Sequence, residues 1–506
     1  MKLLRVVLAV LSLAAIVLVF VDFTGMAAEY FSWLPKLQLV PALLALNVLA
    51  IAVLAALTLL FGRVYCSVIC PLGIYQDIVS RLRHVFASRK KKRIGLFRFE
   101  KAATRLRLSF LAVFAILLGL GLAGVIATSL AGILDPYSAF GRMVGQFAVP
   151  LWRSGMSAAA DTAAEHGHYI IDGYPAAAAF NIGALVVAVI TFVVTTAMAW
   201  TGGRAYCNKV CPAGTILGFL SRHALLRINI NTDLCNRCGS CGRHCKSQCI
   251  DTKNHVVDLS RCVACMDCIG ACSQHAISFS VKPRKSAAKK ADAPDGTRRA
   301  FLVGTAIVAG SMAVKAADKA TDGGLAPLKS KQRVAHAAPA VPAGAVSLAH
   351  LRSYCTACQL CISRCPNGVL KPSSAVGDFM QPVMVFTDGY CRPDCTVCSD
   401  ICPAGAIKPI DTDRKATIKI GTAVVNPDLC ISAAFGQHCG TCARHCPAGA
   451  ITMVKTPKGN MRPAVDESRC IGCGSCEYHC PSGTAGQISA NTAAIHVEGI
   501  RVHTTI

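Results

Sequence analysis

The sequence predicts an α-helical membrane domain joined to small, cysteine-rich domains that mix α and β structure. Long apolar runs alternate with polar stretches along the 506 residues. The 29 cysteines fall almost wholly into closely spaced groups of four. A chain of this length is too long for a single hydrophobic core, so several domains are expected.

Four apolar runs approach or exceed the roughly 20 residues that cross a bilayer. They are Leu4–Val21, Leu39–Phe61, Leu106–Leu130 and Ala178–Trp200. No cleavage site follows the first run promptly, so we interpret it as an uncleaved anchor with a cytoplasmic amino terminus.

The positive charge is distributed as expected for a membrane protein. Residues 81–107 hold eleven Lys or Arg and one acidic residue, which predicts a cytoplasmic loop. The same rule places residues 22–38 and 131–175 outside and the chain after Trp200 inside. The net charge of +25 is concentrated beside the apolar runs, so we expect membrane lipid, and no nucleic acid, as a partner.

Two segments of the membrane half repeat each other. Residues 62–73 read Gly-Arg-Val-Tyr-Cys-x3-Cys-Pro-x-Gly, and residues 203–214 repeat this pattern with Ala in place of Val. The repetition predicts that residues 1–226 form a four-helix membrane domain built as a duplicated helix pair with parallel copies. Four cysteines should converge near the axis between the copies: Cys66, Cys70, Cys207 and Cys211.

These four membrane cysteines allow three interpretations. Their thiolates share a further cluster or metal ion, or they cycle as dithiols or bind copper transiently, or they pack at helix ends. The spacing alone leaves the three open.

Residues 227–281 contain two groups with the spacing Cys-x2-Cys-x2-Cys-x3-Cys, which is typical of [4Fe-4S] ligands. No Cys-x-x-Cys pair is followed by histidine, which argues against c-type haem, and structural zinc sites usually use two separated pairs. We therefore predict a cytoplasmic two-cluster domain with the α+β fold of bacterial ferredoxins. Its ligands are Cys235, Cys238, Cys241, Cys245, Cys262, Cys265, Cys268 and Cys272.

In such domains the last cysteine of each group ligates the other cluster. Cys272 is therefore expected to complete the first cluster and Cys245 the second. Lys246 and Ser273 depart from the usual pattern, because proline commonly follows the fourth cysteine. Cys249 is an additional thiol that either packs beside a cluster or serves as an alternative ligand.

Directly after this domain, residues 282–299 show no regular spacing of apolar residues. Residues 282–299 form a basic linker ending in Arg298-Arg299, which is followed by an apolar segment over 300–316 and a linker over 317–346. The arginine pair and the apolar segment resemble a twin-arginine export signal. Such a route carries a folded domain with its clusters already inserted. The apolar segment is thus expected to be a fifth transmembrane segment or a twin-arginine-like signal. If the distal domain is not exported, the segment is a short membrane hairpin or a buried helix, and all clusters stay cytoplasmic.

Residues 347–506 contain four more cysteine groups, and proline follows the last cysteine of each. We predict a second ferredoxin-like domain with four clusters, which is periplasmic if exported and brings the chain to about six [4Fe-4S] clusters. Sequential and nested pairings of the groups both satisfy the count. The ligands are Cys355, Cys358, Cys361, Cys365, Cys391, Cys395, Cys398, Cys402, Cys430, Cys439, Cys442, Cys446, Cys470, Cys473, Cys476 and Cys480.

No histidine lies within the four apolar runs, so a b-type haem is not expected to carry electrons across the membrane. The remaining routes are the membrane cysteines, diffusion of a quinol such as menaquinol, or no crossing at all. The segment from Asp135 to Arg142 either lines a quinone pocket or is an interfacial loop with a helix cap. No catalytic triad, phosphate loop or dinucleotide-binding glycine pattern stands out, so no independent catalytic site is predicted.

The two Tyr-Cys-x3-Cys-Pro repeats, the adjoining cysteine pair, Arg298-Arg299 and the four distal groups together resemble the polyferredoxin quinol dehydrogenase family. The membrane half is similar to the NapH-type component of periplasmic nitrate reductase systems, and the distal half to its NapG-type (MauM/NapG) ferredoxin partner. This resemblance implies a protein of the bacterial inner membrane. It implies a relay of electrons from quinol or a cytoplasmic donor to a periplasmic redox enzyme or cytochrome.

The resemblance leaves a second function open. Copper-reducing assembly factors share the cysteine repeats and one ferredoxin pair, although they do not need four further clusters. A metal-reducing or maturation factor acting through the membrane cysteines is therefore the alternative.

Overall fold

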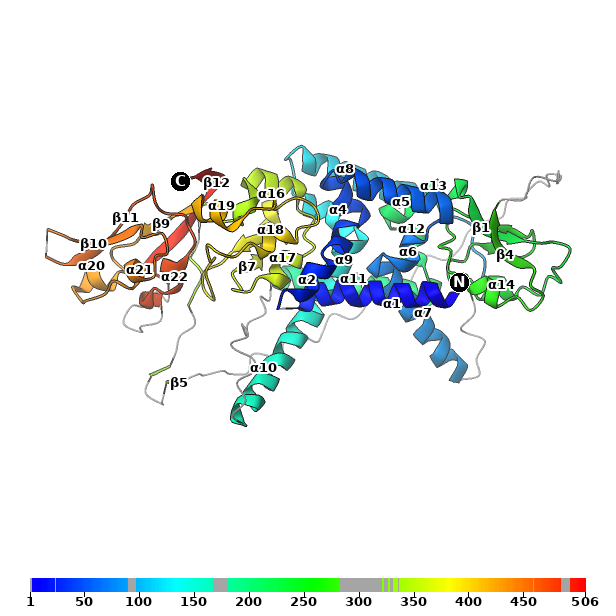
Figure 1. Ribbon diagram of the computed structural model, residues 1–506, viewed down its shortest axis with the longest axis horizontal. Coiled ribbons are helices and arrows are strands. Elements are labelled where there is room, and N and C mark those ends of the chain that lie inside the picture. The colour runs from blue at the N-terminus through cyan, green and yellow to red at the C-terminus, as the bar shows by residue number, and fades with distance from the viewer. Residues whose placement is uncertain are drawn as a thin grey trace, which may run out of the picture.

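The structure is a computed structural model, and it describes residues 2–22, 24–89, 97–166, 181–281, 321–322, 326–327, 331–334, 336–457, 459–483 and 492–506. A helical body lies between two cysteine-rich parts, which sit at its opposite ends (Figure 1). The proposed linker at 282–299, the arginine pair within it and the apolar segment at 300–316 lie outside the described residues.

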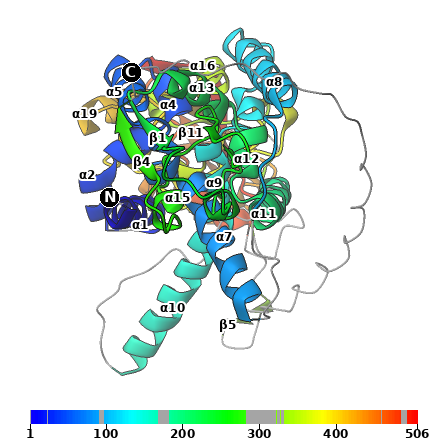
Figure 2. The ribbon, with the colours of Figure 1, turned by 90° about the vertical axis from the view of Figure 1, so that its right-hand side faces the viewer.

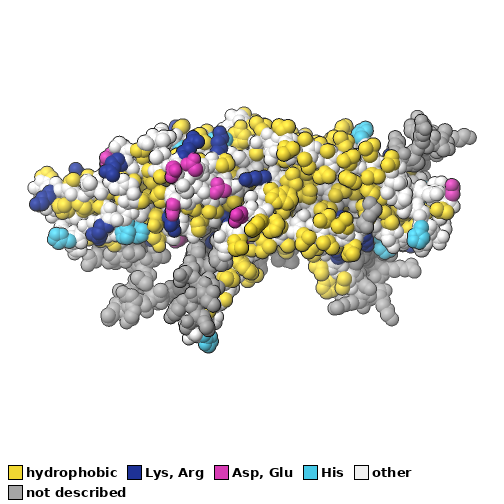
Figure 3. All heavy atoms as spheres, viewed as in Figure 1, with side chains coloured by type: hydrophobic (Ala, Val, Ile, Leu, Met, Phe, Trp, Pro, Cys, Tyr) yellow, Lys and Arg dark blue, Asp and Glu magenta, His cyan; other side chains and the backbone are white. Residues whose placement is uncertain are grey.

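Among the described residues, three helices are long and apolar enough to cross a membrane. They are α1 (Lys2–Val21), α8 (Thr104–Leu122) and α11 (Ile182–Gly202). Hydrophobic side chains gather over the middle of the molecule, and most charged ones visible on this face lie toward its left-hand end, where the C-terminus lies (Figures 1 and 3). This distribution is the one expected if the body sits in a bilayer.

The expected single span at Leu39–Phe61 is wrong, because the run divides into α4 (Leu39–Leu44) and α5 (Val48–Phe61). Leu46 takes a left-handed conformation with φ of 51°, which ends α4. Asn47 then caps α5, and its side-chain oxygen accepts from the Ala50 amide at 3.1 Å.

The expected run from Leu106 to Leu130 is also interrupted. Helix α8 ends at Leu122, Gly124 follows with φ of 75°, and the chain turns into the 3-10 helix η2 (Thr128–Ile133). Glycine takes this conformation without steric cost, which explains where the helix stops.

Helices occupy part of the region that the sequence suggested as an external loop at 131–175. Asp135 caps α9 (Pro136–Met143), whose residues are all buried, and the chain continues through η3 (Val144–Ala148) into α10 (Val149–Glu165). Helix α10 projects away from the body in both ribbon views (Figures 1 and 2). The cap interpretation of Asp135 thus describes its structural role.

The remaining helices of the body are short, apart from α7, and several belong to the repeated segments. They are α2 (Met26–Phe31), α3 (Trp33–Lys36), α6 (Tyr65–Val68), α7 (Pro71–Arg89), α12 (Ala205–Lys209), α13 (Pro212–Leu220) and η4 (Ser221–His223).

The first cysteine-rich part is a small α+β unit closed by its terminal strands. Strand β1 (Leu226–Ile230) pairs antiparallel with β4 (Ile277–Val281), so the two cysteine groups lie between paired ends of the segment. The short strands β2 (Ile250–Asp251) and β3 (Val256–Val257) also pair. Its helices are α14 (Ser240–Arg243) and α15 (Asp267–Gly270).

The distal part has the same kind of organisation at larger size. Strand β9 (Ile418–Val425) pairs antiparallel with β12 (Ile495–Thr505), β10 (Ile451–Lys455) with β11 (Met461–Val465), and β7 (Leu370–Pro372) with β8 (Pro382–Met384). Two strands of two residues each, β5 (Thr321–Asp322) and β6 (Ala326–Pro327), precede the distal part and pair with each other. Its helices are η5 (Ala343–Ala345), α16 (Leu348–Tyr354), α17 (Leu360–Arg364), η6 (Val376–Asp378), α18 (Val397–Asp400), α19 (Thr412–Thr417), α20 (Ile431–Phe435), α21 (Thr441–Arg444), α22 (Ser475–Tyr478) and η7 (Pro481–Gly483).

Candidate metal centres

The first cysteine-rich part gathers its eight predicted ligands into two sets. Cys235, Cys238, Cys241 and Cys272 line one cavity, and we name them the Cys235 set. Cys245 lies with the second group, because Cys268 interacts electrostatically with Cys265, Cys262 and Cys245, and less with Cys241. We name these four cysteines the Cys262 set. This is the crossed grouping expected from the sequence, in which the last cysteine of each group joins the other set.

Cys249 lies beside the Cys262 set. Its sulfur is 3.5 Å from that of Cys245, and it also hydrogen-bonds with Cys262. The additional thiol is therefore buried against two predicted ligands of one cluster.

The first two groups of the distal part are also paired by crossing. Cys361 interacts electrostatically with Cys355, Cys358 and Cys402, so the last cysteine of the second group joins the first group. Cys398 in turn interacts with Cys391, Cys395 and Cys365. We call these the Cys355 set and the Cys391 set.

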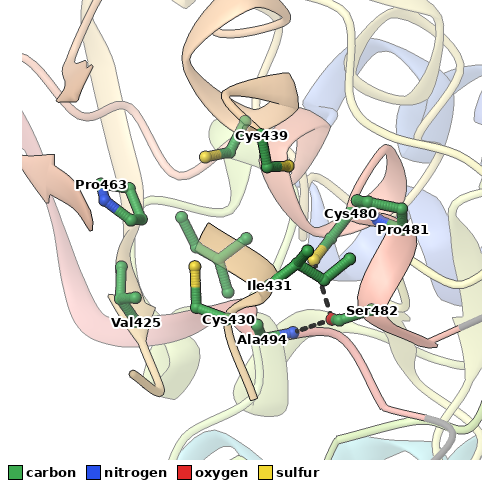
Figure 4. Close-up of a pocket in the computed structure, with 11 residues that line it drawn as sticks. Val425, Cys430, Ile431, Cys439, Pro463, Cys480, Pro481, Ser482 and Ala494 are labelled. Atoms are coloured by element: carbon green, nitrogen blue, oxygen red, sulfur yellow. Dashed lines mark hydrogen bonds between the residues drawn. The ribbon is translucent and has the colours of Figure 1, made fainter. Parts of the chain in front are cut away.

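The last two groups repeat this arrangement. Cys430, Cys439, Cys442 and Cys480 line a cavity, which Figure 4 shows with Cys430, Cys439 and Cys480 labelled. Cys446, Cys470, Cys473 and Cys476 line another. The pairing within the distal part is thus sequential, which the sequence left open. We call the four cysteines of the first cavity the Cys430 set and the four of the second cavity the Cys470 set.

The chemistry of these donor sets fits iron–sulfur clusters. Backbone amides point at ligand sulfurs: that of Ile407 at Cys402 over 3.4 Å, and that of Ala450 at Cys446 over 3.3 Å. Such N–H···S hydrogen bonds stabilise thiolates and help set cluster potential. Among the described residues, no group of three or more His, Cys, Asp or Glu is arranged around a single metal ion. A four-iron cluster takes one thiolate on each iron, so its ligands do not have to meet at one point.

The sets of the distal part follow one another in space. The Cys391 amide donates to the Cys473 carbonyl at 2.9 Å, and the two thiols interact electrostatically. This contact places the Cys391 set beside the Cys470 set. The Cys470 set and the Cys430 set are built from the same two cysteine groups, so these two sets are neighbours as well. At the other end, Cys358 of the Cys355 set packs against the core of the helical body.

The four membrane cysteines are buried together between the repeated segments. Cys211 interacts electrostatically with Cys207, Cys70 and Cys66. The prediction that the four converge therefore agrees with their positions in the structure. Their sulfurs also have polar neighbours, because the Gln76 amide donates to Cys207 at 3.1 Å.

Two fully buried arginines link the repeated segments reciprocally. Arg63 donates to the Cys207 carbonyl at 3.2 Å, and its guanidinium lies 3.8 Å from the Cys66 sulfur. Arg204 donates to the Cys66 carbonyl. Each segment thus supplies an arginine to the first cysteine of the other, which places two positive charges beside the four thiols.

One hydrophobic core joins the membrane cysteines to both cysteine-rich parts. Cys66, Cys70 and Cys211 share this core with Cys265 of the first part, while Cys358 of the distal part packs against it. Tyr137 and Tyr206 belong to the same core, and the Tyr206 hydroxyl donates to the Leu134 carbonyl at 3.3 Å.

A buried carboxylate fixes the first cysteine-rich part to the helical body. Asp77 of α7 is paired with Arg5 at 3.1 Å, with Arg204 at 2.7 Å and with Lys246 at 2.9 Å. Lys246 also reaches Asp267 at 3.1 Å. The position where proline is usual therefore carries a lysine that bridges two domains. The exchange at Lys246 is visible in the sequence, but no sequence signal indicates its partner Asp77.

The distal part is fixed to the opposite end of the body. The Thr128 hydroxyl donates to the Ser353 carbonyl at 2.6 Å, and Gln146 donates to Gln359 at 2.8 Å. Arg142 of α9 donates to the Gly132 carbonyl of η2 at 3.0 Å, so its side chain links these two helices of the body.

Comparisons with known proteins identify the same cysteine-bearing regions. A family model described as a 4Fe-4S binding domain matches twice, at residues 43–94 and 184–232, and each match contains one Cys-x3-Cys-Pro segment. A 4Fe-4S dicluster domain matches residues 437–484, and another 4Fe-4S binding domain matches residues 422–451.

Several curated proteins are similar to parts of the chain. The methylamine utilization ferredoxin-type protein MauM of Methylobacillus flagellatus is 35% identical over 26% of this chain and 59% of its own length. MauN of Paracoccus denitrificans is 28% identical over 36% of this chain and 48% of its own. The putative electron transport protein YccM of Escherichia coli is 32% identical over 20% of this chain and 28% of its own. The chain thus spans less than two thirds of each of these relatives. No solved structure matches.

Proposed function

Because the chain is a ferredoxin-type protein with several 4Fe-4S binding domains, we propose that it relays electrons along its length through a membrane. In this proposal electrons pass between quinol in the membrane, or a cytoplasmic donor at the Cys235 set, and a periplasmic redox partner at the Cys430 set. The resemblance to NapH-type and NapG-type components supports these partners.

The observation that carries the proposal is the order of the cysteine sets. Cys265 of the Cys262 set belongs to the core that contains three of the membrane cysteines, and Cys358 of the Cys355 set packs against the same core. The Cys391, Cys470 and Cys430 sets then follow one another away from the body. Electron transfer needs short steps, and a linear series of one-electron centres provides them.

The membrane cysteines are proposed to hold a further cluster between the two ferredoxin parts. A [4Fe-4S] cluster gains or loses one electron, with a potential set by nearby charge and hydrogen bonding. Arg63 and Arg204 would balance the negative charge of its four thiolates. Tyr206 lies near Cys211, Tyr137 lies near Cys358, and both tyrosines belong to the core that these cysteines share.

Contacts at the two ends of α1 support placement of the ferredoxin parts on opposite faces of the bacterial inner membrane. Lys2 pairs with Asp267 of the first part at 3.0 Å, whereas Asp22 pairs with Arg364 of the distal part at 3.3 Å. A helix of 20 residues is about 30 Å long, which equals the thickness of the hydrocarbon core. With the basic residues 81–107 cytoplasmic, the first part faces the cytoplasm and the distal part the periplasm.

The test uses the full chain, purified anaerobically in mild detergent. Iron near 24 atoms per chain corresponds to the six ferredoxin sets, and near 28 to a further cluster at the membrane cysteines, at about four irons each. Reduction by a menaquinol analogue is followed by EPR. A double variant, Cys66→Ser with Cys207→Ser, is expected to keep the distal iron while its distal clusters stop responding to a reductant supplied to the Cys235 set.

The control replaces Val68→Ala and Val210→Ala, which are partly exposed residues of the same short segments. Unimpaired electron flow in the cysteine variant would remove these thiols from the path. Full iron loading without any response to quinol would exclude quinol as the donor. Reduction of Cu(II) that depends on Cys66 and Cys207, without electron flow to the distal clusters, would favour the metal-reducing alternative.

A further inference from the structure

A cavity of about 330 Å³ lies between α8 and α13, at the end of the body that carries the first ferredoxin part. Its walls are mostly apolar and include Leu108, Leu111, Ile216 and Phe219. Two arginines, Arg107 and Arg222, also line it. An apolar cavity with two cationic side chains at one end is suited to an amphiphilic, negatively charged ligand.

Arg107 is held in place by the ferredoxin part. It is only 4% exposed, and it donates to the Ser260 hydroxyl at 3.2 Å and to the Ser260 carbonyl at 3.3 Å. Gly218 of α13 makes room for this guanidinium, because a Cβ there would lie 2.6 Å from it. Both Nη atoms of Arg107 donate to Ser260, so the guanidinium lines the cavity as a fixed positive charge.

The charges around Arg107 leave a positive excess. Arg63, Arg222 and Arg261 all face it, and Asp258 is the acidic residue nearby. Asp258 is already paired with Arg261 at 2.7 Å. In the described ranges neither Arg107 nor Arg222 forms an ion pair with a carboxylate. The cavity therefore favours an anion over a neutral ligand such as a quinone.

The outer face of α8 extends the apolar wall of the cavity. Leu108, Val113 and Ile116 are exposed, and α8 is one of the three helices able to span a membrane. Arg222 stacks over the Phe219 ring at 5.7 Å, so its charge lies at the rim of the same apolar surface. This arrangement matches a headgroup at the arginines and acyl chains along α8.

We propose that the cavity between α8 and α13 binds the phosphate headgroup of an anionic phospholipid. Basic pockets between transmembrane helices on the cytoplasmic side commonly bind such headgroups. Because Arg107 also holds Ser260, which lies two residues before Cys262, the bound lipid would stabilise the edge at which the first ferredoxin part docks. This site is separate from the proposed electron path and does not depend on it.

The test is native mass spectrometry of the delipidated full chain with phosphatidylglycerol or phosphatidylcholine carrying the same acyl chains. One phosphatidylglycerol is expected to bind in preference to phosphatidylcholine. Arg222→Gln, at an exposed position, should weaken this binding about fivefold, since one cation near a lipid surface contributes roughly 1 kcal/mol. Leu111→Trp should weaken it further by filling the cavity.

Arg105→Gln is the matched control. Arg105 is an exposed arginine in the first turn of α8, close to Arg107, but it does not line the cavity. It should bind the lipid as the unmodified chain does. Equal binding of the two lipids would overturn the proposal, as would equal weakening by Arg105→Gln and Arg222→Gln. Displacement of the lipid by inorganic phosphate would identify a free-anion site, and displacement by a menaquinol analogue would identify a quinone site.

Discussion

Lys246 shows how one residue can convert a ferredoxin turn into a joint between domains. Proline commonly follows the fourth cysteine and contributes only local stiffness. Lysine at this position instead pairs with Asp77 of the helical body and Asp267 of its own domain. The sequence made the exchange visible, but the partner Asp77 is 169 residues away in the chain and no local pattern indicates it.

Replacing Lys246→Met should loosen the docking of the first ferredoxin part. The loss is about 1.5–3 kcal/mol, typical of a hydrogen bond to a charged group, because Asp77 keeps Arg5 and Arg204. Hydrogen exchange at the Arg204 amide, which donates to the Lys246 carbonyl at 2.9 Å, reports on this docking. Lys253→Met, at an exposed position of the same domain, is the control. Unchanged protection in Lys246→Met would show that the ion pairs do not hold the joint.

The docking is also expected to be insensitive to mild acid. Burial disfavours the Asp77 carboxylate, but Arg204 and Lys246 outweigh this effect and hold its pKa well below the usual 3.8. A lowered pKa in the folded state means that the stabilisation is complete above about pH 4 and is lost only as the pH falls through the lower value. Protection of the Arg204 amide, corrected for intrinsic exchange, should therefore match between about pH 8 and about pH 5. A decrease near neutral pH would point to another titrating group.

At the scale of elements, the repeated segments fit together through glycines. A Cβ on Gly73 would collide with the Cys66 carbonyl and lie 2.7 Å from Arg204, and one on Gly214 would collide with the Cys207 carbonyl and lie 2.8 Å from Arg63. The repetition in the sequence thus corresponds to matching contacts around the four thiols. Other features escaped sequence reasoning, because Leu46 and Asn47 interrupt an otherwise continuous apolar run that hydropathy alone predicts as one span.

Gly73→Ala tests this close fit. Alanine favours helix by about 1 kcal/mol over glycine, so any loss must come from the steric conflict, which we expect to cost about 1–3 kcal/mol. Thermal unfolding in detergent, followed by cluster absorbance, should show a lower midpoint. Gly119→Ala in α8 has open space around its Cβ and should leave the midpoint unchanged or raise it. Equal behaviour of the two variants would contradict the proposed packing.

At the scale of the whole molecule, the cysteine sets follow one another from the Cys235 set to the Cys430 set, whose Cys430, Cys439 and Cys442 are partly exposed. Cys238 of the Cys235 set is exposed, whereas Cys265 and Cys355 are buried. Spacing predicted which cysteines are ligands, because ligand spacing is a local property, but it left open which groups of the distal part share their last cysteines. It could not predict the order of the distal sets, since this depends on contacts such as that between Cys391 and Cys473.

Removal of iron should follow this order. With a chelator and a mild oxidant, about eight irons are expected to leave first, four from the Cys235 set and four from the Cys430 set. Iron analysis with EPR measures the sequence of loss. A Cys235→Ser variant identifies the signal of the first set. Early loss from the Cys355 set, at the interface with the body, would contradict the burial seen there.

The contacts at both ends of the helical body have a kinetic consequence. Thr128 holds Ser353, and Asp77 holds Lys246, so neither ferredoxin part has to swing toward the body before a transfer occurs. A swinging carrier slows down as the solvent becomes more viscous. Electron passage inside this chain should instead keep its rate in glycerol, and only encounters with outside donors and acceptors should slow.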